Sequence, residues 1–266
     1  MPAGRLYADG VSAPPPPAAV VELLRQARRI TVLTGAGMSA ESGVPTFRDA
    51  QSGLWERFDP MELATPQAWA ADPERVWAWY LWRAGLVRRV KPHAGHRALA
   101  RLAGDVGGVR REVLVVTQNV DDLHERAGSE VLAHVHGSLL DFRCADCEQP
   151  CPAPELLTTP VERLAPPRCS RCGGLVRPRV VWFGEMLPTG PLQLAESAHA
   201  ETDVVLVIGT SGLVHPAAGL PLTSRGHGIP VVEINPDATG LTDAVDEVWR
   251  TSAAVGLPQL VDALDP

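Results

Sequence analysis

The fold is decided by one stretch of the chain, Thr34-Gly35-Ala36-Gly37-Met38-Ser39-Ala40-Glu41-Ser42-Gly43-Val44-Pro45-Thr46-Phe47-Arg48. It follows an apolar run, residues 30–33, that predicts a short buried strand. A strand that leads into Gly-x-Gly-x-x-Ala and then a helix is the fingerprint of a dinucleotide-binding turn. Gly35 permits the tight turn, Gly37 lets the backbone approach a pyrophosphate, and the small Ala40 lets the helix pack on the strand. A glycine turn in this position can also be only a turn, so the stretch favours a dinucleotide ligand but does not establish one.

The residues after the glycines depart from an ordinary dehydrogenase. Such an enzyme continues to a second strand with an acidic residue, about 20 positions later, that holds the ribose. Here Pro45 is expected to end the helix early, and no such strand follows. We therefore expect the loop from Phe47 and Arg48 to Trp55 to cover the nucleotide.

Length and charge restrict the class of protein. The 266 residues can form one large domain, or a domain with a smaller module. The formal net charge of -7 argues against tight non-specific binding of nucleic acid. No apolar run approaches the roughly 20 residues needed to span a bilayer, and the N-terminus lacks an apolar core of signal-peptide length. We expect a cytoplasmic protein that is a monomer and does not contact membranes.

Two Cys-x-x-Cys pairs, Cys144/Cys147 and Cys169/Cys172, predict a metal site. Each turn directs two thiolates at one point, and two such turns form the tetrahedral sulfur cage typical of structural Zn²⁺. Four protein ligands leave no position for a substrate, so the expected role is to hold the fold together. A redox dithiol or a pair of disulfides are the alternatives, and Cys151 falls outside the pattern.

Polar residues follow the other predicted buried strands. The strands at 113–116, 131–135, 203–208 and 231–234 are followed by Gln118-Asn119-Val120-Asp121, His136-Gly137, Gly209-Thr210-Ser211 and Asn235-Pro236. Because ligands bind outside the carboxyl ends of parallel strands, these groups should converge at one edge of a sheet. His136 is the expected acid–base group, since its reference pKa of about 6.5 lies near working pH. Asp121, Asp122 and the hydroxyl residues could instead cap helices.

Alternating strands and helices predict an α/β fold with a doubly wound, parallel, Rossmann-like sheet and a smaller inserted module. The tryptophan-rich helical segment 59–90 is expected to use its large side chains mainly as core. A further strand is expected at 175–183, and the last helix at 258–264. The expected division is a flexible proline-rich arm (1–17), a Rossmann-like dinucleotide-binding domain (18–49, 91–140 and 178–266), and a helical and zinc-binding module (50–90 and 141–177).

Taken together, the motifs resemble the sirtuins, the NAD-dependent protein-lysine deacylases. The matching segments occur in the family's order over nearly the whole chain from about Ile30: residues 35–48, 117–121, 136–137, the four cysteines, Val181-Trp182-Phe183-Gly184-Glu185, 209–211 and 235–236. The resemblance implies NAD and Zn²⁺ as cofactors and acylated lysine side chains of proteins as substrates.

The resemblance also implies roles for individual residues. His136 would be the catalytic base, with Asn119 beside it in the reacting site. NAD would be held by Gly35, Ala36, Gly37, Ser39, Ala40, Glu41, Thr46, Phe47, Arg48, Trp55, Gln118, Asn119, Asp121, Gly209, Thr210, Ser211, Asn235, Pro236, Asp237 and Ala253. The substrate would contact Tyr80, Arg83, Val181, Phe183, Gly184 and Glu185, with the segment 181–185 pairing with its backbone as an added strand.

The chemistry implied by the resemblance starts with departure of nicotinamide from the ribose C1′. The acyl oxygen of the modified lysine attacks that carbon. His136 then removes a proton from a ribose hydroxyl, which attacks the tethered intermediate, and water completes the release of the lysine. The products are free lysine, nicotinamide and O-acyl-ADP-ribose. Tyr80 and Arg83, three residues apart on a helix, resemble the Tyr-x-x-Arg pair of the sirtuin class that removes succinyl and malonyl groups. A guanidinium can bind the carboxylate of such a group with two hydrogen bonds.

Several alternatives stay open at this point. The pair Tyr80/Arg83 could merely line the pocket of a deacetylase, or form an exposed helical pair. The loop 49–55 is less glycine-rich than expected for the acidic-acyl class. The same cofactor cleft could serve an ADP-ribosyltransferase or an NAD-sensing zinc-knuckle module, and a dehydrogenase is the least favoured reading.

Overall fold

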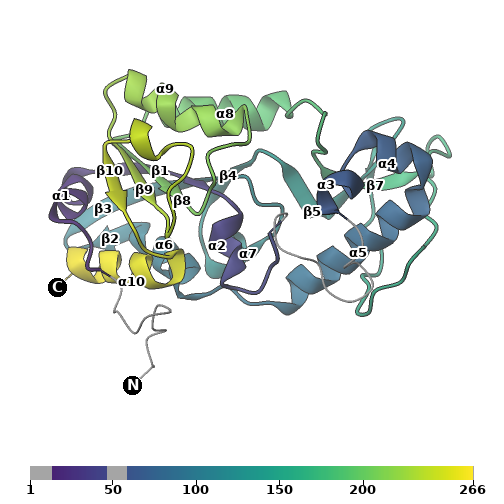
Figure 1. Ribbon diagram of the computed structural model, residues 1–266, viewed down its shortest axis with the longest axis horizontal. Coiled ribbons are helices and arrows are strands. Elements are labelled where there is room, and N and C mark those ends of the chain that lie inside the picture. The colour runs from purple at the N-terminus through teal and green to yellow at the C-terminus, as the bar shows by residue number, and fades with distance from the viewer. Residues whose placement is uncertain (1–13, 47–58, 266) are drawn as a thin grey trace.

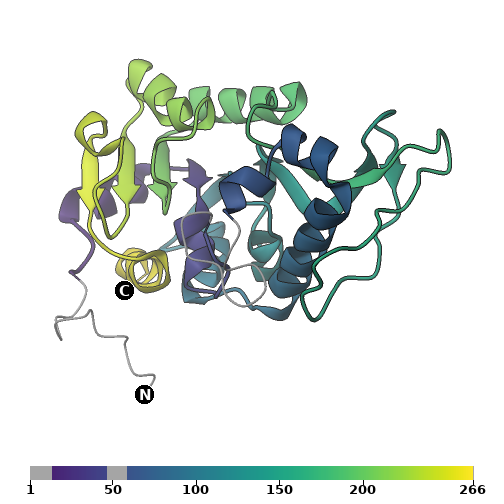
Figure 2. The ribbon, with the colours of Figure 1, turned by 45° about the vertical axis from the view of Figure 1, so that its right-hand side comes forward.

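The computed structural model describes residues 14–46 and 59–265 and has two parts. A large sheet with helices on both faces forms one end of the molecule, and a smaller module of helices and short strands forms the other (Figures 1 and 2). Phe47, Arg48, Trp55 and most of the predicted arm (1–13) lie outside the described residues.

The large sheet has the strand order β10-β9-β8-β1-β3-β2, and β4 also pairs with β3. Its strands are β1 (Arg29–Thr34), β2 (Gly104–Val106), β3 (Val109–Thr117), β4 (Val131–His134), β8 (Val204–Ile208), β9 (Val231–Ile234) and β10 (Glu247–Trp249). All pairings are parallel except that of β2 with β3. The doubly wound α/β sheet with mainly parallel strands is therefore confirmed, whereas the antiparallel strand β2 was not predicted. Gly107 and Gly108, both with positive φ, form the two-residue turn that reverses the chain there.

Helices cover both faces of this sheet. On one face α1 (Ala18–Gln26), α6 (Ala94–Leu102) and α10 (Ala253–Leu264) share a core with the strands. On the other face lie α8 (Thr189–Ala200), the 3₁₀ turn at Ala217–Gly219 and α9 (Leu220–Gly226). The short helices α2 (Ala36–Ala40) and α7 (Leu123–Ala127) follow β1 and β3 at the carboxyl edge. This arrangement brings the predicted strand-end residues to one side of the sheet.

The smaller module combines three helices with a separate antiparallel sheet. The helices are α3 (Pro60–Leu63), α4 (Pro66–Ala71) and α5 (Pro73–Arg89), and the strands are β5 (Gly137–Cys144), β6 (Pro150–Cys151) and β7 (Val176–Val180), in the order β6-β5-β7. Thr65 and Asp72 cap the N-termini of α4 and α5, because their side chains accept hydrogen bonds from backbone N–H groups three residues later. Trp77 packs edge-on against Phe142 at 5.6 Å between ring centroids, which joins α5 to β5.

Two expectations about this module have clear outcomes. The tryptophans do serve as core: Trp77, Trp79 and Trp82 are buried, and Trp69 is half-buried. The strand expected at 175–183 ends at Val180 and belongs to the antiparallel sheet, so the expected domain boundary at residue 178 falls inside β7.

Helix boundaries differ from expectation at two prolines. The helix after the glycine turn ends at Ala40, before Pro45, and Gly43 with φ +91° redirects the chain. The last helix was expected to start at Pro258 but begins at Ala253, because Glu41 accepts hydrogen bonds from the Ala254 N–H and the Ser252 hydroxyl and so caps it.

No helix among residues 14–46 and 59–265 is long and apolar enough to cross a membrane. At the start of the described chain, Trp249 Nε1 donates a hydrogen bond to the Pro14 carbonyl at 3.2 Å. The end of the predicted arm therefore contacts β10.

Three histidines cluster between α6 and α7: His96 and His124 are buried, and His93 is half-buried. The ring of His96 lies 4.2 Å from that of His93 and 5.0 Å from that of His124, measured between centroids. His96 is fully buried, and neither of its ring nitrogens has a hydrogen-bond partner among the described residues. Burial lowers the pKa of His96 to about 2 and that of His124 to about 4. Both rings are therefore neutral in the folded protein at pH 7.

This cluster predicts loss of stability in mild acid. Unfolding returns His96 and His124 to ordinary pKa values of about 6.5, so below that pH the unfolded chain binds more protons. The contribution of the two neutral histidines to the free energy of unfolding is fully present above pH 6.5. It falls as the pH drops toward 4, by up to about 1.4 kcal/mol per pH unit for each group. Urea unfolding at several pH values measures this, and His96→Leu should flatten the profile. The exposed control His227→Gln should retain it; an unchanged slope in His96→Leu would contradict the account.

Candidate functional site

A cavity of about 390 Å³ opens at the carboxyl edge of the large sheet, facing the small module. The predicted residues that line it are Gly35, Ala36, Gly37, Ser39, Thr46, Tyr80, Arg83, Gln118, Asn119, Asp121, His136, Val181, Phe183, Gly184, Glu185, Gly209, Thr210 and Ser211. Those that do not line it are Ala40, Glu41, Asn235, Pro236, Asp237 and Ala253. The cavity thus gathers residues from four strand ends, as the parallel-sheet argument expects.

The glycine turn packs directly against the loop after β8. Gly35 N–H donates to Ile208 O at 3.0 Å, and Gly37 N–H donates to Gly209 O at 2.8 Å. A Cβ on Gly37 would stand 2.8 Å from that same Gly209 oxygen. In this structure Gly37 therefore permits close contact between two loops that form one wall of the cavity, a use that the pyrophosphate argument did not anticipate.

A buried hydrogen-bond network joins the glycine turn to the end of β3. The Asn119 side-chain amide donates to Gly35 O and to the Ser39 hydroxyl, both at 2.9 Å. Ser39 in turn donates to Asp121 Oδ2 at 2.8 Å, and Asp121 Oδ1 accepts the Leu123 N–H. Burial raises the pKa of Asp121, and the Ser39 hydrogen bond opposes that rise. The network fixes Asn119 and Asp121 on the cavity wall, and Asp121 also satisfies the first N–H group of α7.

Gln118 extends the network to the loop after β8. Its side-chain amide donates to the Thr210 hydroxyl at 3.0 Å. Three loops, which follow β1, β3 and β8, are thus tied together around the cavity. Such ties hold polar groups in fixed positions before any ligand arrives.

His136 occupies the cavity wall between β4 and β5. Its Nδ1 lies 3.0 Å from the Gln118 carbonyl oxygen. A carbonyl can only accept, so Nδ1 carries the hydrogen and Nε2 is the nitrogen that can take a proton. Burial lowers the pKa of His136, partly offset by the Gln118 hydrogen bond, so the ring is neutral at pH 7. The next residue, Gly137, has φ +76°, and a Cβ there would stand 1.9 Å from Arg179 O.

Tyr80 and Arg83 face the same cavity from α5. Both side chains are buried, at 3% and 6% exposure, so the alternative of an exposed helical pair was wrong. Arg83 Nη2 donates to Pro45 O at 3.5 Å, and its guanidinium carbon lies 5.1 Å from the centroid of the Trp79 ring. Burial lowers the pKa of Arg83 and raises that of Tyr80. Burial thus works against the charge on Arg83, and a bound anion would work in its favour.

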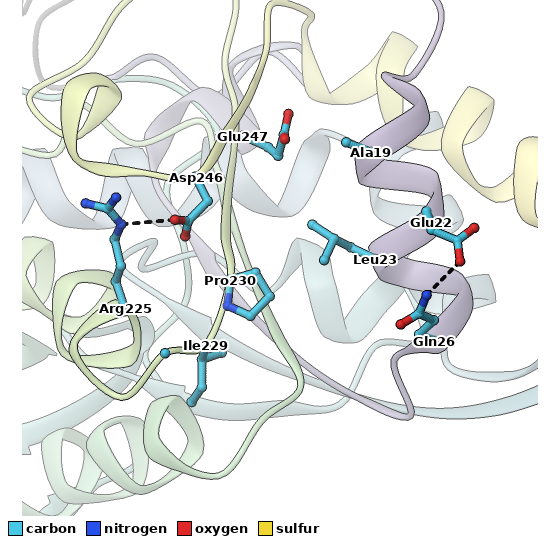
Figure 3. Close-up of a pocket in the computed structure, with 10 residues that line it drawn as sticks. Ala19, Glu22, Leu23, Gln26, Arg225, Ile229, Pro230, Asp246 and Glu247 are labelled. Atoms are coloured by element: carbon cyan, nitrogen blue, oxygen red, sulfur yellow. Dashed lines mark hydrogen bonds and ion pairs between the residues drawn. The ribbon is translucent and has the colours of Figure 1, made fainter.

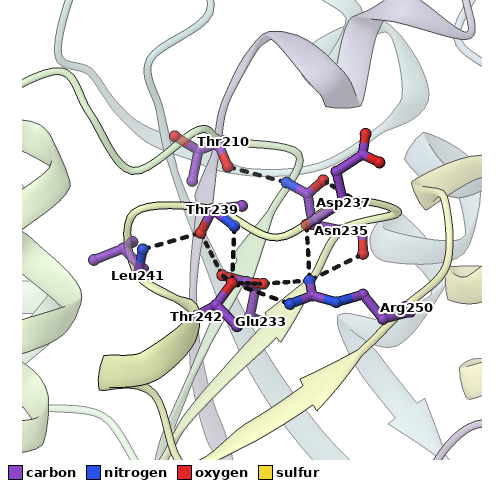
Figure 4. A network of polar contacts seen from close by, with 8 residues as sticks. All are labelled: Thr210, Glu233, Asn235, Asp237, Thr239, Leu241, Thr242 and Arg250. Carbon is purple, nitrogen blue, oxygen red and sulfur yellow. Dashed lines mark hydrogen bonds and ion pairs between the residues drawn. The ribbon is translucent and has the colours of Figure 1, made fainter.

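The loop after β9 is held by a second polar network, although Asn235 and Asp237 do not line the cavity (Figure 4). The buried carboxylate of Glu233 accepts hydrogen bonds from Thr239, Thr242 and Arg250. Arg250 also donates to Asp237 O, and the Asn235 amide donates to Thr210 O at 3.0 Å. The loop is therefore fixed against the one that follows β8.

The four predicted metal ligands form a compact group beside β5 and β7. The Sγ atoms of Cys144, Cys147, Cys169 and Cys172 all lie within 4.8 Å of one another, and no disulfide joins them. Sulfur atoms about 3.8 Å apart are what a tetrahedral Zn²⁺ with 2.3 Å bonds requires. Backbone N–H groups of Asp146, Arg171 and Gly174 point at three of the sulfurs from 3.4 Å. The donor set fits zinc, and the disulfide alternative is not found.

Loss of this metal is expected to destabilise the small module. Cys147→Ser removes one of four ligands, so we expect less than one equivalent of zinc and a melting temperature at least about 5 °C lower. Elemental analysis and tryptophan fluorescence on heating measure the two effects. Cys151→Ser is the matched control, because the Cys151 thiol donates to Gln149 O and lies outside the ligand set. Equal zinc loss in both variants would refute the assignment.

A second hollow, more open and about 580 Å³ in volume, lies at the opposite edge of the sheet (Figure 3). It is lined by α1 and by the residues where β9 and β10 begin, including Leu23, Ile229, Pro230 and Glu247. None of the predicted site residues lines it, so its size does not make it the reactive site.

Residues that were not among the predicted site residues also line the cavity. They include Val44, Met61, Leu139, Trp182, Leu187 and His215. Most are apolar and carry no chemical signal in the sequence. Trp182 lies within the motif 181–185 and His215 follows the motif 209–211, and these positions were the available signal.

Comparison with known proteins agrees with this geometry. The model of the Sir2 family matches residues 35–216. The chain is 52% identical over 238 residues to the NAD-dependent protein deacylase of Mycobacterium tuberculosis, covering 89% of this chain and 98% of that one. It is 49% identical over 245 residues to the NAD-dependent protein deacylase of Corynebacterium glutamicum, covering 92% and 94%.

Solved structures give the same result. A Sir2 homolog–NAD complex superposes with a TM-score of 0.82 at 44% identity and 94% coverage of each chain. A Sir2 homologue mutant in complex with 2′-O-acetyl ADP ribose gives 0.81 at 43% identity, covering 93% of this chain and 96% of that one. The family match spans more than half of the chain, and the strand-end cavity with its histidine lies within it. The chain therefore belongs to the Sir2 family, the sirtuins.

Proposed function

We propose that the protein is an NAD-dependent protein-lysine deacylase that accepts succinyl and malonyl groups as well as acetyl groups. The names of its relatives and the NAD and 2′-O-acetyl ADP ribose bound to related structures support the general activity. The observation that carries it is His136, a neutral imidazole with its Nδ1 hydrogen-bonded and its ring in the cavity.

The cavity suits a nucleotide in size and lining. Its volume of about 390 Å³ lies in the range of cofactor and ligand pockets. Glycine loops form one wall, and Gln118, Thr210 and Ser211 supply amide and hydroxyl groups that can bond ribose and phosphate. NAD, when bound, would supply a ribose whose C1′ becomes electrophilic as nicotinamide leaves and whose hydroxyl oxygen finally receives the acyl group.

The chain's own residues would then position the reacting groups and remove a proton from the ribose. Asn119 and Asp121 are held by the Ser39 network and would orient the groups at the nicotinamide end. His136 Nε2 would accept a proton from a ribose hydroxyl, since Nδ1 is committed to Gln118 O. Apolar walls, among them Leu139 and Phe183, would exclude water around the acyl-lysine.

The preference for acidic acyl groups is supported by Tyr80 and Arg83. A guanidinium can form two parallel hydrogen bonds with a carboxylate, and a phenol hydroxyl can add a third. Both groups are buried and line the cavity that also contains His136. A carboxylate in this position would compensate the cost of burying the Arg83 charge.

An acyl panel tests the proposal. The protein is incubated with NAD and matched acetyl-, malonyl- and succinyl-lysine peptides, and released nicotinamide and deacylated peptide are quantified. We expect NAD-dependent release with all three, faster with the acidic groups. No release with any peptide would refute deacylation, and faster acetyl turnover would leave a deacetylase without acidic preference. Transfer of label from NAD to a protein acceptor would instead indicate an ADP-ribosyltransferase.

A further inference from the structure

An arginine outside the cavity closes the turn that forms one of the cavity's walls. Arg177 on β7 is buried at 5% exposure. Its Nη1 and Nη2 donate to Glu185 Oε1 at 2.6 Å and Oε2 at 3.0 Å, and Nη2 also donates to Val180 O at 3.0 Å. Glu185 Oε2 accepts the Trp182 N–H at 2.9 Å as well. The guanidinium is thus enclosed by the turn from Val180 to Glu185.

The same guanidinium stacks on a tryptophan that lies between it and the proposed acyl pocket. Its carbon lies 3.1 Å from the centroid of the Trp182 ring. Trp182 in turn stacks on Tyr80, with 6.4 Å between ring centroids and 29° between planes. Tyr80 lines the cavity together with Arg83. An unbroken series of contacts therefore leads from Arg177 through Trp182 to the proposed acyl-binding pair.

These contacts change the expected role of Glu185. The resemblance placed it among the substrate-binding residues, but its two carboxylate oxygens are engaged by Arg177 and by the Trp182 N–H. Backbone contacts hold the rest of the turn: Val181 N–H donates to His136 O and Phe183 N–H donates to Ala64 O, both at 2.9 Å. The carboxylate of Glu185 thus acts within the protein, although residues 181–185 line the cavity.

We propose that Arg177 is a positioning residue for the acyl-lysine side of the site: it holds the 181–185 turn through Glu185 and the Tyr80 ring through Trp182. This inference rests on the proposed function. Because the glycine turn and the loops after β8 and β9 make their contacts independently of Arg177, the NAD side should not depend on it.

Steady-state kinetics of Arg177→Met with a succinyl-lysine peptide and NAD test this. We expect the KM for peptide to rise about tenfold or more, since a charge-assisted bidentate contact is lost, with the KM for NAD within about twofold. Calorimetric titration of peptide should show the same weakening. Arg177→Lys, which keeps the charge but not the bidentate geometry, should lie in between. Arg179→Met, an exposed arginine two residues along β7, is the matched control and should behave as the wild type.

Each result decides the point. Equal rises of both KM values, or a lower kcat with both KM values unchanged, would overturn the positioning role. If Arg177→Met does not fold, Glu185→Gln takes its place, since glutamine keeps the shape of the side chain. It must then raise the KM for peptide while leaving the KM for NAD unchanged. Absence of turnover in the wild type and in Arg179→Met would instead count against the proposed function itself.

Discussion

Replacing His136 with alanine is expected to lower kcat/KM for deacylation by about 10²–10⁴-fold, the usual contribution of a positioned general base. The imidazole lines the cavity, and its Nδ1 donates to Gln118 O, which leaves Nε2 as the nitrogen that can accept a proton. Circular dichroism and zinc content should be unchanged, because the ring takes no part in the cysteine group or in the main apolar cores.

A neighbouring histidine provides a matched control. His134 stands two residues earlier and also places Nδ1 on a backbone carbonyl, that of Asn119, at 3.0 Å. Its Nε2, however, is bonded to Glu125 at 2.6 Å, and the ring does not line the cavity. His134→Gln should therefore reduce activity far less than His136→Ala. Similar losses in both variants would show that the base lies elsewhere.

The pH profile gives a second readout of the same residue. A general base must be neutral, so activity is lost as the pH falls through its pKa. Because burial lowers the pKa of His136, the acid midpoint of kcat/KM should lie below 6.5. A midpoint clearly above 6.5 would exclude His136 as the group that titrates.

Much of the site was predictable because parallel strands place their carboxyl ends together. Gln118, His136 and Gly209 are far apart in sequence, yet each follows an apolar run, and the structure brings all three to one cavity. The cysteine spacing was equally informative, since four thiolates in two short turns have few other arrangements. In both cases a local pattern carries a geometric consequence.

The parts that escaped prediction depend on long-range partners. Glu41 remains only a predicted cofactor contact, and its sequence neighbours gave no sign that its carboxylate caps α10, more than 200 residues away. Likewise nothing in the residues around Arg177 reveals that its guanidinium is enclosed by the turn ending at Glu185. The start of α10 was missed because the capping carboxylate lies in another segment, whereas Pro258 is visible locally. Sequence patterns report on residues close together in the chain, whereas these contacts join residues that only the folded structure brings together.

Replacing Arg83 with methionine is expected to lower desuccinylation far more than deacetylation. Methionine keeps an unbranched apolar side chain in the cavity but removes the cation, so an incoming succinyl carboxylate would be buried without its partner. Truncating one member of a buried charge pair costs several kcal/mol, so kcat/KM for desuccinylation should fall about 100-fold or more. Deacetylation brings no carboxylate and should change less than about tenfold.

Two further variants sharpen this test. Tyr80→Phe removes only the hydroxyl and should also reduce desuccinylation more than deacetylation, but to a smaller extent, because one neutral donor contributes less than a charged bidentate one. Arg89→Met alters an exposed arginine near the end of the same helix and should affect neither reaction. Equal losses on acetyl and succinyl peptides in Arg83→Met would mean that the guanidinium only shapes the pocket, and the proposed preference for acidic acyl groups would have to be abandoned.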